Sequence, residues 1–190
     1  MDDIVQAAEV GKGSFYNHFT DRESLVRAIS AEIRASVERA VDQANAGVED
    51  PAHRVARACC TYLRFALDDP ERAGVLVRVH SGHTSLKTPL NQGLIDDISL
   101  GLRIGRFRVP TLEASVLFVL GVSQIALIRV LQGPSPEFAV PLAQQLCAMM
   151  LTGLRVPDAE ADMIAAQATE EVVRLGVYSE AFKLPETGTP

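Results

Sequence analysis

The chain has 190 residues, of which 47% are hydrophobic, and this length and composition suit one or two globular domains and exclude a disordered chain. A formal net charge of −6 at pH 7 excludes a surface that binds nucleic acid throughout, because phosphate contacts need clustered Lys and Arg, so any DNA contact has to be local. Three cysteines without a C-x-x-C pair exclude a disulfide framework and a zinc site, and they favour a reducing cytoplasm.

The first two predicted helices, residues 2–8 and 12–18, have the spacing of a helix-turn-helix with Gly11 at the turn. Phe15 and Phe19 lie four residues apart and point the same way as apolar anchors. The other positions of the second helix carry small or hydrogen-bonding side chains. A short helix of this kind suits the major groove of DNA, where its N-terminal part reaches base edges and phosphates.

A long helix is predicted at residues 21–45, where an apolar residue recurs at every fourth position. This stripe consists of Leu25, Ile29, Ile33, Val37 and Val41. Thr20 and Glu23 have the spacing of a capping box and predict how the helix begins. The helix directly follows the helix-turn-helix and would connect it to the rest of the chain.

Four prolines, each preceded by a short polar residue, mark the starts of further helices, because proline is well tolerated at the first helical position. The pairs are Asp50-Pro51, Asp69-Pro70, Thr88-Pro89 and Ser135-Pro136. Together with the apolar spacing they predict helices at residues 51–67, 70–80, 89–105, 111–132, 136–154 and 158–175. No segment alternates as a strand does, so the predicted fold class is all-α. Residues 183–190 are expected to form a disordered tail.

The most apolar segment, residues 114–128, is bracketed by Glu113 and Arg129 and is shorter than the ~18–20 residues that a bilayer span needs. We therefore expect a helix buried in protein and no membrane partner. The N-terminus lacks the pattern of a signal peptide, so we expect a cytoplasmic protein.

The segment IVQAAEVGKGSFYNHFTDRESL, residues 4–25, resembles the helix-turn-helix of the TetR family of transcriptional regulators. The usual pattern there is an Ala-Gly-Val turn, Ser-Lys-Gly, an apolar residue, Tyr, one or two polar residues, Phe and a capped helix. The rest of the chain resembles the family only in its arrangement of helices. The resemblance implies DNA contacts by Lys12, Gly13, Ser14, Tyr16, Asn17 and His18.

Three positions depart from the family pattern: Glu9 replaces a glycine of the turn, Gly11 replaces a capping serine, and Arg22 replaces a lysine. The family's DNA-binding domain also begins with a helix that would precede residue 1 of this sequence. From Met1 to Ala46 there are five positive and eight negative residues, whereas a DNA-binding domain is normally positive. We therefore expect weakened DNA affinity, whether the cause is a misplaced start codon or a true truncation.

The resemblance implies a DNA-binding domain at residues 1–46, which lacks its first helix and includes the linking helix 21–45, and a regulatory and dimerisation domain at residues 47–182. In the family, helices of the second domain surround a small-molecule cavity. The residues predicted on this basis to bind the ligand are Tyr62, Phe65, His80, Phe118 and Gln124. Ordinary core packing is the alternative interpretation of the aromatic residues and of Gln124.

Two histidines and two cysteines raise the alternatives of a metal site and a thiol sensor. His80 and His83 have no third ligand at a suitable spacing, so we expect no metal there. Cys59 and Cys60 are adjacent and face different ways on a helix, so we expect one of them to be buried and inert. A thiol sensor is the alternative interpretation.

Helices 111–132 and 136–154 carry more apolar surface than one domain of this size needs to bury. A second copy would cover it, because two such helices from each chain form a four-helix interface in a two-fold dimer. Gly121 and Ser123 would permit the close approach of the helices.

The predicted function is that of a homodimeric, ligand-responsive DNA-binding regulator, a repressor that a small molecule releases from its operator. The alternative is a helical homodimer that binds a small apolar molecule without specific DNA binding. No catalytic or cofactor-binding motif is present, so we expect neither enzyme activity nor a cofactor.

Overall fold

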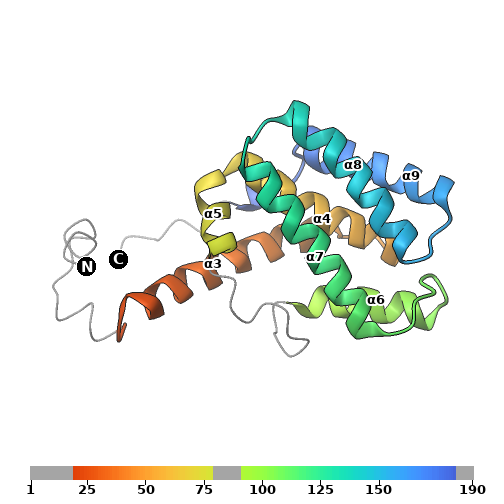
Figure 1. Cartoon of the computed structure of the whole chain (residues 1–190), viewed down its shortest axis with the longest axis horizontal. Coiled ribbons are helices and arrows are strands. Elements are labelled where there is room, and N and C mark those ends of the chain that lie inside the picture. The colour runs from red at the N-terminus through yellow and green to blue at the C-terminus, as the bar shows by residue number, and fades with distance from the viewer. Residues whose placement is uncertain (1–18, 79–90, 183–190) are drawn as a thin grey trace.

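The computed structural model describes residues 19–78 and 91–182, and within these ranges the chain forms helices and no strands, which confirms the predicted all-α fold (Figure 1). The helices are α3 (Arg22–Ala44), α4 (Pro51–Asp68), α5 (Pro70–Arg78), α6 (Gln92–Arg103), α7 (Leu112–Leu131), α8 (Pro136–Gly153) and α9 (Asp158–Ala168). A π-helical turn (Thr169–Arg174) and a 3-10 helix (Ser179–Phe182) follow. The predicted helices 2–8 and 12–18 and the tail 183–190 lie outside the described residues.

The predicted boundaries agree with these helices to within three residues, apart from the end of the last one. The predicted helix 158–175 ends as an α-helix at Ala168 and continues as the π-helical turn Thr169–Arg174. The predicted helix is therefore present, but its last part is π-helical and not α-helical. Apolar spacing over six residues does not distinguish the i→i+5 hydrogen bonds of a π-helix from the i→i+4 bonds of an α-helix.

The start of α3 differs by one residue from the predicted capping box. Asp21 is the N-cap: its side chain accepts a hydrogen bond from the Ser24 N–H at 2.6 Å, and its own N–H donates to Ser24 Oγ at 3.2 Å. The predicted box of Thr20 and Glu23 is therefore wrong. Aspartate caps a helix at least as well as threonine, so the next residue along the chain took this role.

The proline-marked starts are confirmed for the three helices that the described residues include. Asp50 and Ser135 cap α4 and α8, and their side chains accept hydrogen bonds from backbone N–H groups at 3.1 and 3.4 Å. Asp69 accepts one from the Arg72 N–H at 3.0 Å at the start of α5. The pair Thr88-Pro89 lies outside the described residues.

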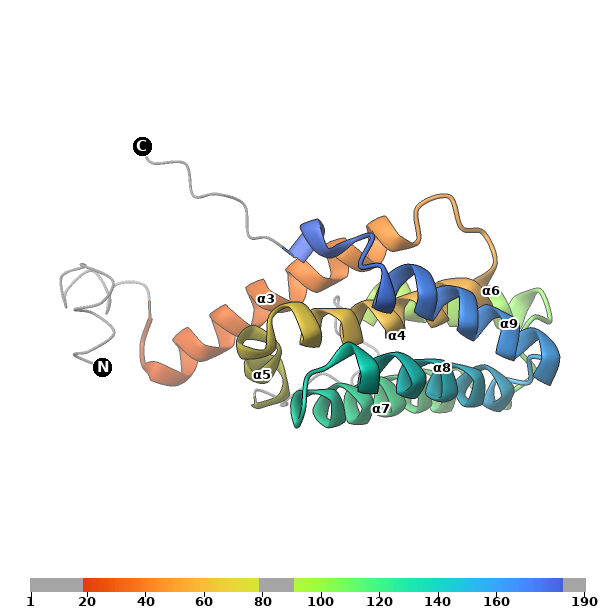
Figure 2. The same cartoon turned by 90° about the horizontal axis from the view of Figure 1, so that it is seen from above.

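The packed helices form the body of the molecule. Helix α4 lies at its centre and packs against α3, α5, α6, α7, α8 and α9 (Figures 1 and 2). Its side chains Val55, Leu63 and Phe65 are fully buried, as expected for a helix that other elements surround. In the view of Figure 2, α7 and α8 lie side by side along one side of the body, and α3 lies on the opposite side of α4.

Only the C-terminal part of α3 belongs to this body. No residue of α3 before Ser30 is buried, whereas seven residues from Ser30 to Ala44 are. In Figure 1 the N-terminal part of α3 extends beyond the other helices. The helix is therefore held at one end and carries the preceding part of the chain at the other.

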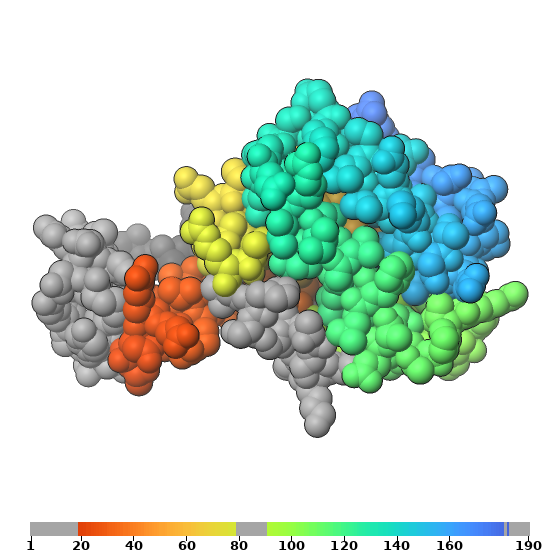
Figure 3. Space-filling model, viewed as in Figure 1, coloured from red at the N-terminus to blue at the C-terminus, as the bar shows by residue number. Residues whose placement is uncertain are grey.

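Helices α7 and α8 lie at the surface in the view of Figure 3, and they carry the exposed apolar side chains Leu117, Phe118, Ile125 and Met149. Helix α7 has a mean hydropathy of 2.1 and is long and apolar enough to cross a membrane, yet only 33% of that stretch is buried in the body. The expected burial of this segment therefore holds for one side only. Phe118 on α7 and Met149 on α8 are 41% and 67% exposed.

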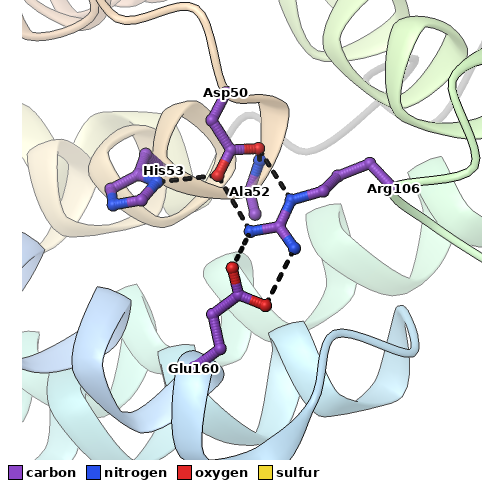
Figure 4. Close-up of polar contacts among 5 residues, drawn as sticks. All are labelled: Asp50, Ala52, His53, Arg106 and Glu160. Carbon is purple, nitrogen blue, oxygen red and sulfur yellow. Dashed lines mark hydrogen bonds and ion pairs between the residues drawn. The ribbon is translucent and has the colours of Figure 1, made fainter.

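Arg106, in the connection between α6 and α7, joins the start of α4 to the start of α9 (Figure 4). Its Nε and Nη2 atoms each donate to a carboxylate oxygen of Asp50 at 2.8 Å, and Nη1 and Nη2 donate to Glu160 at 3.0 and 2.9 Å. His53 Nδ1 lies 2.8 Å from Asp50 Oδ2. Burial alone would raise the pKa of Asp50, but the hydrogen bonds from Arg106, His53 and Ala52 lower that pKa to about 2.

Candidate ligand-binding cavity

A cavity of about 270 Å³ lies between α3, α4, α6 and α7. Apolar side chains form much of its wall: Val41, Val55, Ala58, Cys59, Leu94, Leu117, Val119, Leu120, Ile125 and Leu127. An apolar cavity of ~150 Å³ accommodates a benzene ring. The space is therefore sufficient for a single ring with substituents.

One face of α3 forms the polar side of the cavity. Arg34, Glu38, Val41, Asp42 and Asn45 all line it, and their spacing places them on the same side of the helix. These residues lie in the part of α3 that packs against the body. An occupant of the cavity would therefore contact α3 directly.

Glu38 and Tyr62 form a hydrogen-bonded pair between α3 and α4 at this polar side, with the tyrosine hydroxyl donating to Glu38 Oε1. Burial raises the pKa of Glu38, although the bond from Tyr62 and the charge of Arg34 oppose this effect. Burial and the nearby Glu38 charge raise the pKa of Tyr62 far above its usual range. The hydroxyl therefore stays protonated and remains a donor.

Arg34 and Asn45 bring hydrogen-bonding atoms that the described residues leave without a partner. Arg34 is buried, and its Nη2 donates to Asn91 Oδ1 at 2.5 Å, but its Nε has no partner there. Asn45 is also buried, and its Oδ1 has none. A buried polar atom without a partner costs free energy, so a ligand group that reached either atom would gain a bond without breaking one.

Arg54 and Asp97 connect α4 to α6 at the edge of the cavity. Arg54 Nε donates to Asp97 Oδ1 at 2.5 Å, and Nη1 donates to the carbonyl oxygens of Asn45 and Val48 at 3.2 and 3.3 Å. Burial raises the pKa of Asp97, although the hydrogen bond and charge of Arg54 oppose this. Both charged groups are thus already partnered within the protein, which leaves the Glu38 and Arg34 region for a ligand.

The structure places the predicted ligand residues differently. Tyr62 and Gln124 line the cavity. Phe65 does not: it is fully buried, and its ring lies 5.2 Å from that of Phe182. Phe118 is on the outer face of α7, where its ring packs on Gly153. His80 lies outside the described residues, as do the predicted DNA-binding residues from Lys12 to His18.

Sequence reasoning missed the charged residues of the cavity, namely Arg34, Glu38, Arg54 and Asp97. Arg34 and Glu38 adjoin the apolar stripe of the long helix at a spacing of four, which is a usable signal. The same spacing is typical of a solvent-exposed face with an ion pair, so the signal does not distinguish the two. Arg54 and Asp97 are 43 residues apart and only the fold brings them together.

The comparisons with known proteins agree with this arrangement. The family described as tetracyclin repressor-like, C-terminal domain matches residues 50–167, which is more than half of the chain, and the bacterial regulatory proteins of the tetR family match residues 1–29. No curated protein matches the chain.

Two solved structures of RolR resemble the chain, each with 28% sequence identity. RolR in complex with the ligand resorcinol has a TM-score of 0.64, covering 86% of this chain and 81% of RolR. RolR without ligand has a TM-score of 0.63, covering 86% of this chain and 83% of RolR. Both domain matches and both structures agree, and we conclude that this chain belongs to the TetR family of bacterial transcriptional regulators.

Proposed function

We propose that this chain is a cytoplasmic, ligand-responsive DNA-binding regulator, a repressor that a small molecule in the cavity releases from its operator. The observation that carries this proposal is that α3 lines the cavity with Arg34 and Glu38 and continues directly from the segment that matches the tetR family. A ligand that changes the position of α3 would change the position of the DNA-binding segment. The shift is limited by the difference between the ligand's affinities for the two positions.

The ligand we propose is a single-ring compound with at least one hydroxyl group. A ring fits the apolar wall and the volume of about 270 Å³. A hydroxyl would accept a hydrogen bond from Arg34 Nε and donate either to Glu38 or to the Tyr62 hydroxyl oxygen, because the Tyr62 proton is already donated to Glu38. RolR was solved with resorcinol, a ring of this class, which supports the choice of resorcinol as the first probe.

The DNA contacts and the dimer remain predictions. For the former we propose Lys12, Gly13, Ser14, Tyr16, Asn17 and His18, within a DNA-binding domain at residues 1–46. For the dimer interface we propose the apolar outer face of α7 and α8, which the second copy would cover. The regulatory domain would then be residues 47–182.

The test is a titration of the full chain against its own promoter DNA by fluorescence anisotropy, at one fixed salt concentration, with and without resorcinol. We expect tighter binding to the promoter than to a scrambled duplex, and weaker binding when resorcinol is added. Equal binding to both duplexes would refute the DNA-binding function. Specific DNA binding that resorcinol leaves unchanged, together with no heat of resorcinol binding in calorimetry, would refute the proposed ligand class.

The variant Tyr62→Phe tests whether the polar side of the cavity binds the ligand. Loss of one hydrogen bond of about 1 kcal/mol corresponds to roughly a fivefold weaker resorcinol affinity. The matched control is Asp162→Asn, an exposed position on α9 that does not line the cavity. An unchanged affinity in Tyr62→Phe would place the ligand elsewhere.

A further inference from the structure

The C-terminal segment, residues 169–182, returns to α3 after the end of α9 (Figure 2). It begins in the core, where Thr169 Oγ1 lies 3.7 Å from Cys60 Sγ. Cys59 and Cys60 are both buried, whereas we expected this of one of them. The segment ends in the 3-10 helix, and within the described residues α4, α5 and this 3-10 helix are the elements that pack most extensively on α3. The last described element therefore packs on the first.

Two arginines of α4 hold the segment before it reaches α3. Arg64 Nη1 donates to the Val173 carbonyl oxygen at 3.0 Å. Arg57 Nη2 donates to the Tyr178 hydroxyl oxygen at 2.6 Å and lies 3.0 Å from Glu171 Oε2. Hydrogen bonds with a charged donor are stronger than those between neutral groups, so these contacts fix the path of the segment.

Arg72, on α5, connects the end of the segment to α3. Its Nη1 donates to the Phe182 carbonyl oxygen and its Nη2 to Ser36 Oγ, both at 2.9 Å. The Ser36 hydroxyl in turn donates to the Ile33 carbonyl oxygen at 2.6 Å, so its own proton is also used. The rings of Phe65 and Phe182 lie 5.2 Å apart, and both residues are buried. One guanidinium group therefore bonds α3 and the 3-10 helix at the same time.

This contact lies on the side of α3 opposite to the cavity. Arg34 and Glu38 line the cavity, and Ser36 does not. Ser36 is two positions from each of them, and two positions along an α-helix correspond to about 200° around its axis. The cavity and the C-terminal segment thus contact α3 from opposite sides. A ligand that acts on α3 from the cavity would act against the bond between Ser36 and Arg72.

We propose that the C-terminal segment is the support against which a ligand moves α3, and that Arg72 is the positioning residue of this support. The proposal rests on the proposed function, because it takes the ligand to act on α3 from the cavity. With the segment in place, the buried part of α3 is fixed and a change in the cavity reaches its N-terminal end. Without the 3-10 helix, α4 and α5 remain as the main contacts of α3 within the described residues, and the DNA response to the ligand weakens.

Hydrogen–deuterium exchange tests the support without DNA or ligand. A chain that ends at Tyr178 lacks the 3-10 helix, and a chain that ends at Phe182 is the matched control. We expect the amides from Ser30 to Ala44 to exchange about tenfold faster in the former and at the unchanged rate in the control, while α8 and α9 keep their rates in both. Unchanged exchange of α3 would overturn the proposal. Equal acceleration of α3, α8 and α9 would also overturn it, because the segment would then stabilise the whole body.

A point variant of the full chain tests the role of Arg72. Arg72→Met removes the donors to Ser36 and Phe182 and should accelerate exchange in the same part of α3. Arg174→Met is the matched control, because Arg174 belongs to the same segment, is exposed, and pairs with Glu170 within it at 3.0 Å. It should leave the exchange of α3 unchanged. Equal exchange of α3 in the two variants would overturn the positioning role.

A titration with promoter DNA separates this proposal from the proposed function. The chain that ends at Tyr178 keeps every residue that lines the cavity, so its resorcinol affinity in calorimetry should match that of the full chain. Resorcinol should weaken its promoter binding by a smaller factor than it does for the full chain, and an equal factor in both would overturn the proposal. If the full chain does not bind its promoter, the proposed function fails, and the exchange of α3 still decides whether the segment supports this helix.

Discussion

Glu38 and Tyr62 place an ionisable pair on the cavity wall at a cost to stability. A partly buried carboxylate loses some of its hydration, and one hydrogen bond from Tyr62 together with the charge of Arg34 does not fully replace it, since the pKa of Glu38 remains raised. A residue that reduces stability in this way and borders a cavity fits a binding role better than a structural one.

Glu38→Gln is therefore expected to raise the melting temperature at neutral pH. The raised pKa means that the folded state binds a proton more readily than the unfolded state, so ionisation of Glu38 reduces stability as pH rises through the range above its ordinary value of 4.5. Glutamine keeps an acceptor for Tyr62 and does not titrate. The gain should be present at pH 7 and should vanish below about pH 4. Thermal melts of both proteins from pH 4 to pH 8 measure it, and a gain that persists at pH 4 would contradict this explanation.

Arg106→Gln should destabilise the protein by about 1.5–3 kcal/mol at neutral pH, because it removes charge-assisted bonds to two carboxylates. The pKa of Asp50 is lowered to about 2, so the stability that its ionised form contributes is present above its ordinary value of 3.8 and is lost as pH falls towards 2. Urea unfolding should thus show a constant difference between the two proteins above about pH 5 that narrows below about pH 4. A difference that does not change with pH would show that the bonds between Arg106 and Asp50 do not account for the lost stability.

At the scale of single residues, the sequence predicts helix starts well and cavity chemistry poorly. Asp50 and Ser135 were identifiable as caps because a cap acts on its own next residues. Tyr62 and Gln124 were placed near a cavity through the family resemblance, and they do line one. The arginines of the cavity have partners far away in sequence, and no local pattern distinguishes them from surface arginines.

Among the helices, α6 ends in a turn that packs closely against Gly101. After Arg103 the chain turns at Gly105, which has a φ of +74°, and returns so that the ring of Phe107 covers Gly101. The Phe107 N–H donates to the Gly101 carbonyl oxygen at 3.0 Å. A Cβ atom at Gly101 would lie 2.1 Å from that ring, so any larger residue would force the ring to move.

Gly101→Ala should destabilise the protein by about 1–3 kcal/mol through overpacking. Gly93, on the same helix, is the matched control, because a Cβ atom there meets nothing within 4 Å. Gly93→Ala should be neutral or stabilising by up to about 1 kcal/mol. Urea unfolding of the two variants compares them, and equal effects would show that the ring of Phe107 adapts.

The elements themselves were predictable because their signals are local. Apolar spacing and proline-marked starts identified every α-helix in the described ranges, but not the short 3-10 helix Ser179–Phe182. Two details were not predictable. The cap of α3 moved by one residue because Thr20 and Asp21 are both good caps, and the turn after Ala168 widened into a π-helix without a sequence signal.

For the whole molecule, the open face of α7 and α8 is the feature that a single copy does not explain. Both helices bury one side against the body and leave large apolar side chains outside. An exposed apolar patch of this kind is usual for an interface between protein copies. TetR-family regulators form dimers, and this face is the one that we propose for the second copy.

Met149→Glu should weaken the dimer by about 30-fold or more, because a carboxylate would be buried in an apolar interface at a cost of about 2 kcal/mol or above. Leu175→Glu is the matched control: Leu175 is 63% exposed, follows the π-helical turn and belongs to neither α7 nor α8. Sedimentation equilibrium measures both. A dimer that tolerates Met149→Glu and is lost in Leu175→Glu would move the interface to the other end of the chain.

Because only its C-terminal part packs against the body, α3 would convert a small change in the body into a large displacement of its N-terminal end. Its 23 residues at about 1.5 Å each give a rod of about 34 Å. A rotation of about 5° around its anchored end would displace the other end by about 3 Å, which is as long as a hydrogen bond. In the regulator that we propose, a ligand would therefore not have to unfold or reorganise the protein to release DNA. A tilt of this one helix by a few degrees would be sufficient.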